Sequence, residues 1–103
     1  MERTAAVDYG RRRIGLAVAD PLGITVRGLE TIDRVEDPAD GARRTAAALA
    51  AEQVTRVLVG LPLHASGEES EMSAEARRFV ALLATEAGLP VAFVAETLTT
   101  WVA

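Results

Sequence analysis

An acid and three arginines stand close together near the N-terminus, where they could bind a metal ion and a phosphate. Asp8 ends an apolar segment and is followed by Gly10 and by Arg11, Arg12 and Arg13. A carboxylate in a buried strand loses hydration unless a partner replaces the water, so we expect a metal ion or another partner at Asp8. Gly10 would permit a positive φ angle or a close approach of two backbone segments.

The composition limits the kind of site and the class of protein. The chain has no cysteine and one histidine, His64, which excludes a disulfide scaffold and leaves oxygen ligands for any metal. Its 103 residues fit one domain, residues 1–103, and the net charge of −4 leaves room for local arginine clusters. No apolar run approaches the ~20 residues that span a bilayer and no signal peptide is evident. We therefore expect a cytoplasmic protein without a membrane partner.

Five strands must position these residues. Alternating or continuous apolar runs predict strands over residues 4–9, 14–20, 24–31, 55–61 and 91–95. The continuous apolar run Val57, Leu58, Val59 predicts a strand that is covered on both faces. The order of elements implies a mixed sheet, antiparallel in its first hairpins and parallel across right-handed crossovers.

Two helices are expected between the later strands. Asp37 and Pro38 are typical of a helix start and predict a helix to about Gln53. Its apolar side is predicted to carry Ala46, Leu49 and Ala50. The spacing of apolar residues predicts a second helix that ends near Gly88, with Met72, Ala76, Phe79 and Leu83 on its apolar face. Thr99 or Thr100 is typical of the N-cap of a further helix.

Three separated motifs resemble one family. VDYGRRRIGLAVAD, LVGLPLHASGEES and AETLTT, at residues 7–20, 58–70 and 95–100, are similar to the YqgF (RuvX) family. The resemblance implies an α/β ribonuclease H-like fold: a five-stranded mixed sheet in the order 3-2-1-4-5, flanked by helices, with the family's C-terminal helix missing. It also implies a metal-dependent nuclease that uses Mg²⁺ or Mn²⁺. Its substrate would be structured RNA, in maturation of pre-16S rRNA, with Holliday-junction DNA as a second class.

The resemblance also implies roles for individual residues. Asp8 and Glu96 would be the catalytic, metal-binding acids, and Arg12 and Arg13 would bind nucleic acid. The pocket loops would comprise Gly10, Gly60, Pro62, Gly67, Thr99 and Thr100. The chain departs from the family pattern at Ala95, where an acid is usual, and at Thr97, where an arginine is usual.

Alternatives remain open for these residues and for the function. Asp8 could instead cap the turn by accepting hydrogen bonds from amides after Gly10, and Glu96 could be a solvent-facing residue near a helix start. The arginine cluster could be a solvated turn, and His64 is expected at the surface rather than as a general base. Sugar kinases and actin-like ATPases share the first motif, but 103 residues cannot supply their two domains. A non-catalytic nucleic-acid-binding or ribosome-assembly module is the alternative function, and a homodimer that covers Trp101 is a further hypothesis.

Overall fold

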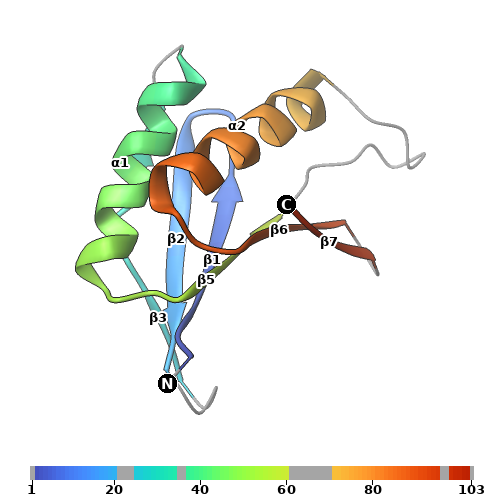
Figure 1. Ribbon diagram of the computed structural model, residues 1–103. Coiled ribbons are helices and arrows are strands. Elements are labelled where there is room, and N and C mark those ends of the chain that lie inside the picture. The colour runs from blue at the N-terminus through green and yellow to red at the C-terminus, as the bar shows by residue number, and fades with distance from the viewer. Residues whose placement is uncertain (1, 21–24, 35–36, 61–70, 96–97, 103) are drawn as a thin grey trace.

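The computed structural model describes residues 2–20, 25–34, 37–60, 71–95 and 98–102. These residues form a seven-stranded mixed sheet and two helices (Figure 1). The elements are β1 (Thr4–Tyr9), β2 (Arg13–Ala19), β3 (Val26–Gly28), β4 (Ile32–Asp33), α1 (Pro38–Ala51), β5 (Arg56–Gly60), α2 (Glu71–Ala87), β6 (Val91–Ala95) and β7 (Leu98–Trp101). Neighbouring strands follow the order β3-β2-β1-β5-β6-β7, and β4 also pairs with β2. The predicted order of five strands is confirmed by the run β3-β2-β1-β5-β6, and β4 and β7 are additional.

The predicted third strand, residues 24–31, is shorter in the structure. It contains β3 at Val26–Gly28, and β4 at Ile32–Asp33 follows beyond the predicted range and also pairs with β2. Gly28 pairs with Ala17 and Ile32 pairs with Ile14, so four steps along this segment oppose three steps along β2. One extra residue of this kind is a β-bulge, which bends a strand and breaks its ladder. The bulge is the physical reason for two short strands, β3 and β4, in place of one.

Helix α1 begins where the sequence predicts. The Asp37 carboxylate accepts a hydrogen bond from the amide of Ala39 at 3.0 Å, and Pro38 occupies the start of the helix. The helix ends at Ala51 rather than at Gln53, whose φ of 57° is outside the helical region. The pair Asp37 and Pro38 therefore located the start of the helix correctly, whereas the predicted end lies slightly too far along the chain.

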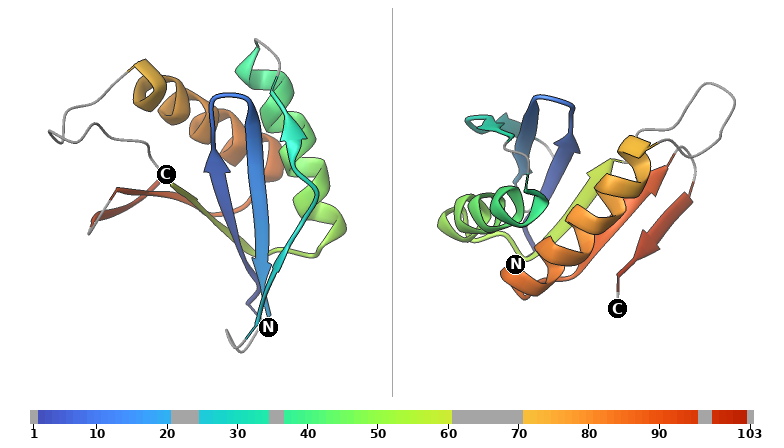
Figure 2. Two further views of the ribbon diagram at one scale, coloured as in Figure 1. Left: turned by 180° about the vertical axis from the view of Figure 1, so that it is seen from behind. Right: turned by 90° about the horizontal axis from the view of Figure 1, so that it is seen from above.

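Both helices cover the same face of the sheet. Figures 1 and 2 show α1 and α2 side by side, with the strands beneath them. β1, β5 and β6 are parallel neighbours, and the chain steps across them in one direction. Two right-handed crossovers in the same direction place their helices on the same face. The prediction that β5 is covered on both faces is wrong: Val57 and Val59 are fully buried, whereas Leu58, which points the other way, is partly exposed.

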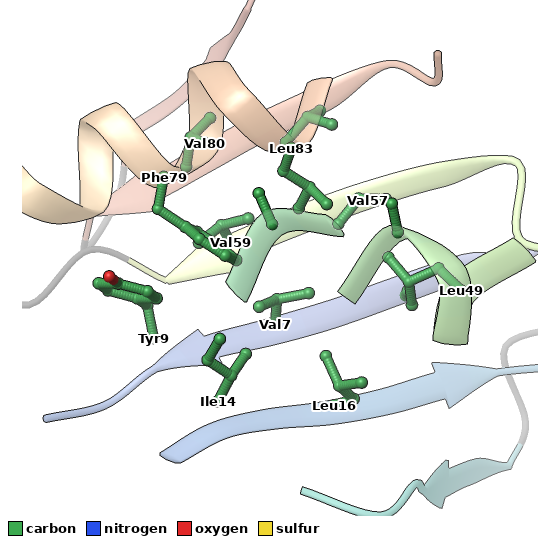
Figure 3. Close-up of a cluster of buried hydrophobic side chains, with 14 of the residues drawn as sticks. Val7, Tyr9, Ile14, Leu16, Leu49, Val57, Val59, Phe79, Val80 and Leu83 are labelled. Atoms are coloured by element: carbon green, nitrogen blue, oxygen red, sulfur yellow. The ribbon is translucent and has the colours of Figure 1, made fainter. Parts of the chain in front are cut away.

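The core lies between the helices and this one face of the sheet. Figure 3 shows Val7, Ile14 and Leu16 pointing from the strands toward the helices. The largest fully buried side chains are Phe79, Ile14, Leu49, Leu83, Val57, Val59, Val80, Val91 and Thr45. The predicted helix positions Ala76, Phe79, Leu83, Ala46 and Leu49 are confirmed as buried, whereas Ala50 is exposed. No helix in the described part of the chain is long and apolar enough to cross a membrane.

Strand β7 takes the place of the helix that was predicted to begin at Thr99 or Thr100. It runs antiparallel to β6, with Thr99 opposite Val94 and Thr100 opposite Phe93. The helix prediction is therefore wrong. Threonine is β-branched and suits a strand as well as it suits a helix cap, so the local signal was ambiguous.

Candidate active site

Asp8 lies near the end of β1, on the face of the sheet that the helices leave open. Its neighbours Val7 and Tyr9 are buried, and the alternation of side chains along a strand sends Asp8 to the other face. The side chain of Asp8 is exposed. The expectation that burial forces a partner on Asp8 is wrong, because an exposed carboxylate keeps its hydration. A chemical role for Asp8 must therefore rest on its position.

Glycine stands on both sides of Asp8 in the sheet. Asp8 pairs with Gly15 of β2 and with Gly60 of β5. A Cβ atom at Gly15 would lie 3.7 Å from the Cβ of Asp8, and a Cβ at Gly60 would meet nothing within 4 Å. The absence of side chains at both positions leaves the carboxylate accessible from either side. A ligand could thus approach Asp8 across the sheet as well as from solvent.

A shallow hollow on the open face ends at this carboxylate. Its volume is about 530 Å³, and its lining includes Ala6, Asp8, Gly15, Ala17, Leu58 and Val94. Small and apolar residues form its floor, and Asp8 is its acidic residue. The hollow is therefore a mainly apolar surface with the Asp8 carboxylate at one end.

The turn between β1 and β2 is closed by backbone groups. The Gly10 amide donates to the carbonyl oxygens of Arg13 at 3.0 Å and of Asp8 at 3.1 Å. A Cβ atom at Gly10 would lie 2.8 Å from the carbonyl oxygen of Arg13, so Gly10 permits a close approach and not a positive φ angle. No residue in the described ranges donates a hydrogen bond to the Asp8 carboxylate. The structure thus lacks the interaction that a turn-capping role for Asp8 requires.

Arg12 and Arg13 are exposed in this turn and at the start of β2. Arg13 and Gly15 are two residues apart in one strand and therefore share a face, which is also the face of Asp8. Within the part of the chain that the structure describes, neither Arg12 nor Arg13 forms an ion pair. Both guanidinium groups can therefore bind an anion from solvent.

The carboxyl ends of three parallel strands meet beside Asp8. Asp8 pairs with Gly60 of β5, and Gly60 pairs with Val94 of β6. Ala95 is the last residue of β6 at this edge. The backbone of Thr99 pairs with Val94, so β7 begins beside the hollow. Five residues that the sequence analysis singled out lie outside the described ranges: Pro62, His64, Gly67, Glu96 and Thr97.

Among the described residues, Asp8 is the candidate metal ligand. No group of three or more acidic, histidine or cysteine side chains that could hold a metal ion occurs among them. Asp20 follows the end of β2 that is far from Asp8. The Asp20 carboxylate accepts hydrogen bonds from the backbone amide of Thr25 at 3.0 Å and from the hydroxyl of Thr25 at 2.6 Å. Asp8 fits as one ligand of a hydrated Mg²⁺ or Mn²⁺ ion, because such ions bind through one or two carboxylates and retain water.

The sequence analysis missed a partly buried charged cluster behind the turn. Arg34 lies over the ring of Tyr9, 4.3 Å from its centroid, and forms an ion pair with Glu75 of α2. These residues are far apart in the chain, so neither periodicity nor a local motif joins them. Tyr9 stands next to Asp8 but faces the helices, and burial raises the pKa of its phenol.

Comparisons with known proteins agree with this architecture and with its motifs. Residues 2–103 match the profile of RuvX, described as Holliday junction resolvase. A relative from Koribacter versatilis, named "Putative pre-16S rRNA nuclease", is 45% identical over 89 residues, which are 86% of this chain and 58% of the relative. A relative of the same name from Rhodopirellula baltica is 40% identical over 98 residues, which are 95% of this chain and 56% of the relative. The chain thus spans little more than half the length of these relatives.

A solved structure shows the same fold. The chain is similar to Thermus thermophilus RuvC in complex with a Holliday junction substrate, with a TM-score of 0.64 and 24% identity, over 93% of this chain and 66% of that one. This likeness confirms the predicted ribonuclease H-like fold. The profile match over residues 2–103 shows that the chain belongs to the RuvX family.

Proposed function

We propose that this chain carries the metal-binding and phosphate-binding part of a nuclease that hydrolyses phosphodiester bonds in structured RNA. The proposed substrate is pre-16S rRNA, after the names of the relatives, and Holliday-junction DNA is a second substrate class. One observation carries the proposal: Asp8 is exposed between two glycines on the open sheet face, which it shares with Arg13.

Asp8 is the proposed first ligand of Mg²⁺ or Mn²⁺, and Glu96 the second. Glu96 directly follows Ala95, the residue that ends β6 at the edge where β1 also ends. A bound divalent ion would supply a more acidic water molecule and would stabilise negative charge on the phosphate. An exposed carboxylate suits this role, because the ion can keep most of its water while one side of it remains open to substrate.

Arg12 and Arg13 are the proposed phosphate contacts. Their side chains are exposed and form no ion pair among the described residues. Both residues lie close to Asp8 in the chain, where the hairpin turn between β1 and β2 leads into β2. Arginine binds phosphate through paired hydrogen bonds and so orients the group as well as attracting it. A phosphate held there would present the neighbouring bond to the ion at Asp8.

A non-catalytic nucleic-acid-binding or ribosome-assembly module is the second candidate. Two observations favour it: Ala95 replaces the acid that is usual in the family pattern, and the described residues contain no complete metal-binding group. Such a module would bind RNA through the same arginines and would not cut it.

The deciding experiment incubates the 103-residue chain with pre-16S rRNA and Mg²⁺ or Mn²⁺, and compares it with the Asp8→Asn variant. Glu86→Gln is the matched control, because it makes the same carboxylate-to-amide change at an exposed position of α2. We expect cleavage that a chelator abolishes, that Asp8→Asn lowers at least about a hundredfold and that Glu86→Gln leaves unchanged. RNA binding without cleavage would support the non-catalytic module instead.

A further inference from the structure

Arg34 makes three hydrogen bonds to one turn. Its Nη1 atom donates to the carbonyl oxygens of Gly10 at 2.8 Å and of Arg11 at 3.0 Å. Its backbone amide donates to the carbonyl oxygen of Arg12 at 2.9 Å. Three successive carbonyl groups of the turn between β1 and β2 therefore accept from a single residue.

The guanidinium of Arg34 is itself held on its other sides. It stacks on the ring of Tyr9 at 4.3 Å, and its Nη2 atom donates to the carboxylate of Glu75 in α2. Tyr9 in turn stacks on Phe79 of α2, with 4.4 Å between the ring centroids. The Arg34 side chain is only 11% exposed. A buried cation costs free energy unless it is paired and hydrogen bonded, and here carbonyls, a carboxylate and an aromatic ring surround it.

These contacts join the turn to helix α2. Glu75 and Phe79 belong to the helix that covers β5 and β6, while the turn follows directly after Asp8. The hydrogen bonds from Arg34 to three carbonyls of the turn favour the backbone arrangement that the structure has. That arrangement determines where the exposed side chains of Arg12 and Arg13 stand relative to Asp8.

We propose that Arg34 is a positioning residue, which fixes the turn so that Arg12 and Arg13 bind a phosphate beside Asp8. The inference rests on the proposed function, since it assigns the arginines to nucleic acid. Arg34 itself does not touch the substrate. It acts by holding the backbone that carries the two phosphate ligands.

The Arg34→Lys variant tests this role. Lysine keeps the charge and can still pair with Glu75, but its compact ammonium cannot also bond two carbonyls and stack on Tyr9. Leu83→Ala is the control, because it destabilises the core at a fully buried position of α2. The readout is the affinity of each variant for a fluorescein-labelled RNA hairpin, measured without divalent ions over a range of salt concentrations.

We expect Arg34→Lys to weaken hairpin binding about tenfold and to reduce the slope of log affinity against log salt by about 1.5, whereas Leu83→Ala changes neither. In the Arg34→Lys background, further replacement of Arg12 and Arg13 by glutamine should weaken binding by less than about twofold. The reason is that Arg12 and Arg13 have already lost their contacts with the phosphate in that background. Additive losses, or equal binding by Arg34→Lys and Leu83→Ala, would overturn the inference.

Hydrogen exchange separates this inference from the proposed function. The Gly10 amide, which donates to the Arg13 carbonyl, should exchange faster in Arg34→Lys than in Leu83→Ala. If the unmodified chain does not bind the hairpin, the proposed function fails, while faster exchange at Gly10 would still establish that Arg34 holds the turn. Equal exchange in both variants would show that it does not.

Discussion

Tyr9 carries the one phenol of this molecule, and its environment changes its acidity. The sequence contains no lysine, no cysteine and a single tyrosine. Burial raises the pKa of the Tyr9 phenol above its usual value of 10.0; the nearby carboxylate of Glu75 acts in the same direction and the guanidinium of Arg34 opposes it. A raised pKa means that the folded state favours the protonated phenol.

The free energy of unfolding should therefore fall when the pH rises above about 10. The phenol contributes its full stabilisation below the pKa of the unfolded chain and loses it as the pH rises toward the higher pKa of the folded state. The expected loss is up to about 1.4 kcal/mol per pH unit in this window. Urea unfolding of the unmodified chain and of Tyr9→Phe between pH 8 and 11 measures it. An equal slope in Tyr9→Phe would contradict the assignment.

Gly10 is required by the close approach of two backbone segments. In Gly10→Ala the new Cβ would lie 2.8 Å from the carbonyl oxygen of Arg13, a backbone atom that cannot move aside cheaply. We expect a loss of stability of about 1–3 kcal/mol. Gly28→Ala is the control, because its Cβ would meet nothing within 4 Å and should be neutral or stabilising by up to about 1 kcal/mol. Equal midpoints of thermal unfolding for the two variants would refute the contact.

At the scale of the elements, the sheet has one covered face and one open face. Each central strand contributes core residues to one face of the sheet and exposed residues, such as Asp8, to the other, because side chains alternate along a strand. Helices α1 and α2 pack on the core face and stabilise the fold, while the other face remains open for ligands. Asp8 can consequently change without loss of core packing.

Neighbouring residues of β5 should show this difference in their stability effects. Val59 is fully buried under the helices, whereas Leu58 lines the hollow on the open face. We expect Val59→Ala to cost about 2–3 kcal/mol and Leu58→Ala about 1 kcal/mol or less, although Leu58→Ala removes more atoms. Chemical denaturation of both variants tests this. A larger loss for Leu58→Ala would mean that the open face is covered in the folded protein.

At the scale of the whole molecule, a net charge of −4 opposes general attraction to nucleic acid. Binding must then depend on a local cluster of cations. The turn supplies such a cluster beside the open face, whereas helix α1, which carries Arg43 and Arg44, lies on the covered side of the sheet (Figure 1). The distribution of charge, rather than its sum, determines the expected orientation of RNA.

Two pairs of adjacent arginines allow a matched test of this orientation. Replacement of Arg12 and Arg13 by glutamine should reduce the slope of log affinity against log salt by about 1.5, because two phosphate contacts are lost. The same replacement of Arg43 and Arg44, which contact Asp40 on α1, should leave the slope unchanged. Fluorescence anisotropy of a labelled RNA hairpin measures both slopes. An equal change in both variants would indicate non-specific attraction.

The homodimer hypothesis stays a prediction. Trp101 is 49% exposed in β7, an edge strand, and Val26 is 70% exposed in β3 at the other edge. Edge strands with exposed apolar side chains favour association. We expect light scattering to give the mass of a dimer and Trp101→Glu to give that of a monomer. A monomer mass for the unmodified chain would contradict the hypothesis.

The sequence by itself determined the elements whose signals are local. The bounds of β1 and β6 were predicted correctly, and the capping pair Asp37 and Pro38 located the start of α1. The spacing of Phe79 and Leu83 predicted their burial in α2. Each of these signals arises from residues within one strand or one helix, where periodicity and hydrogen bonds to the nearest amides decide the conformation. The position of Asp8 at the end of a strand belongs to the same class.

The tertiary structure alone decided which face each residue occupies and which distant residues meet. The shared direction of two right-handed crossovers placed both helices on one side, which left Leu58 and Asp8 on an open face. Arg34 reaches the turn after β1 and Glu75 of α2 only when the chain is folded. No local pattern encodes such contacts, because their geometry depends on how β4, α2 and the first hairpin pack together.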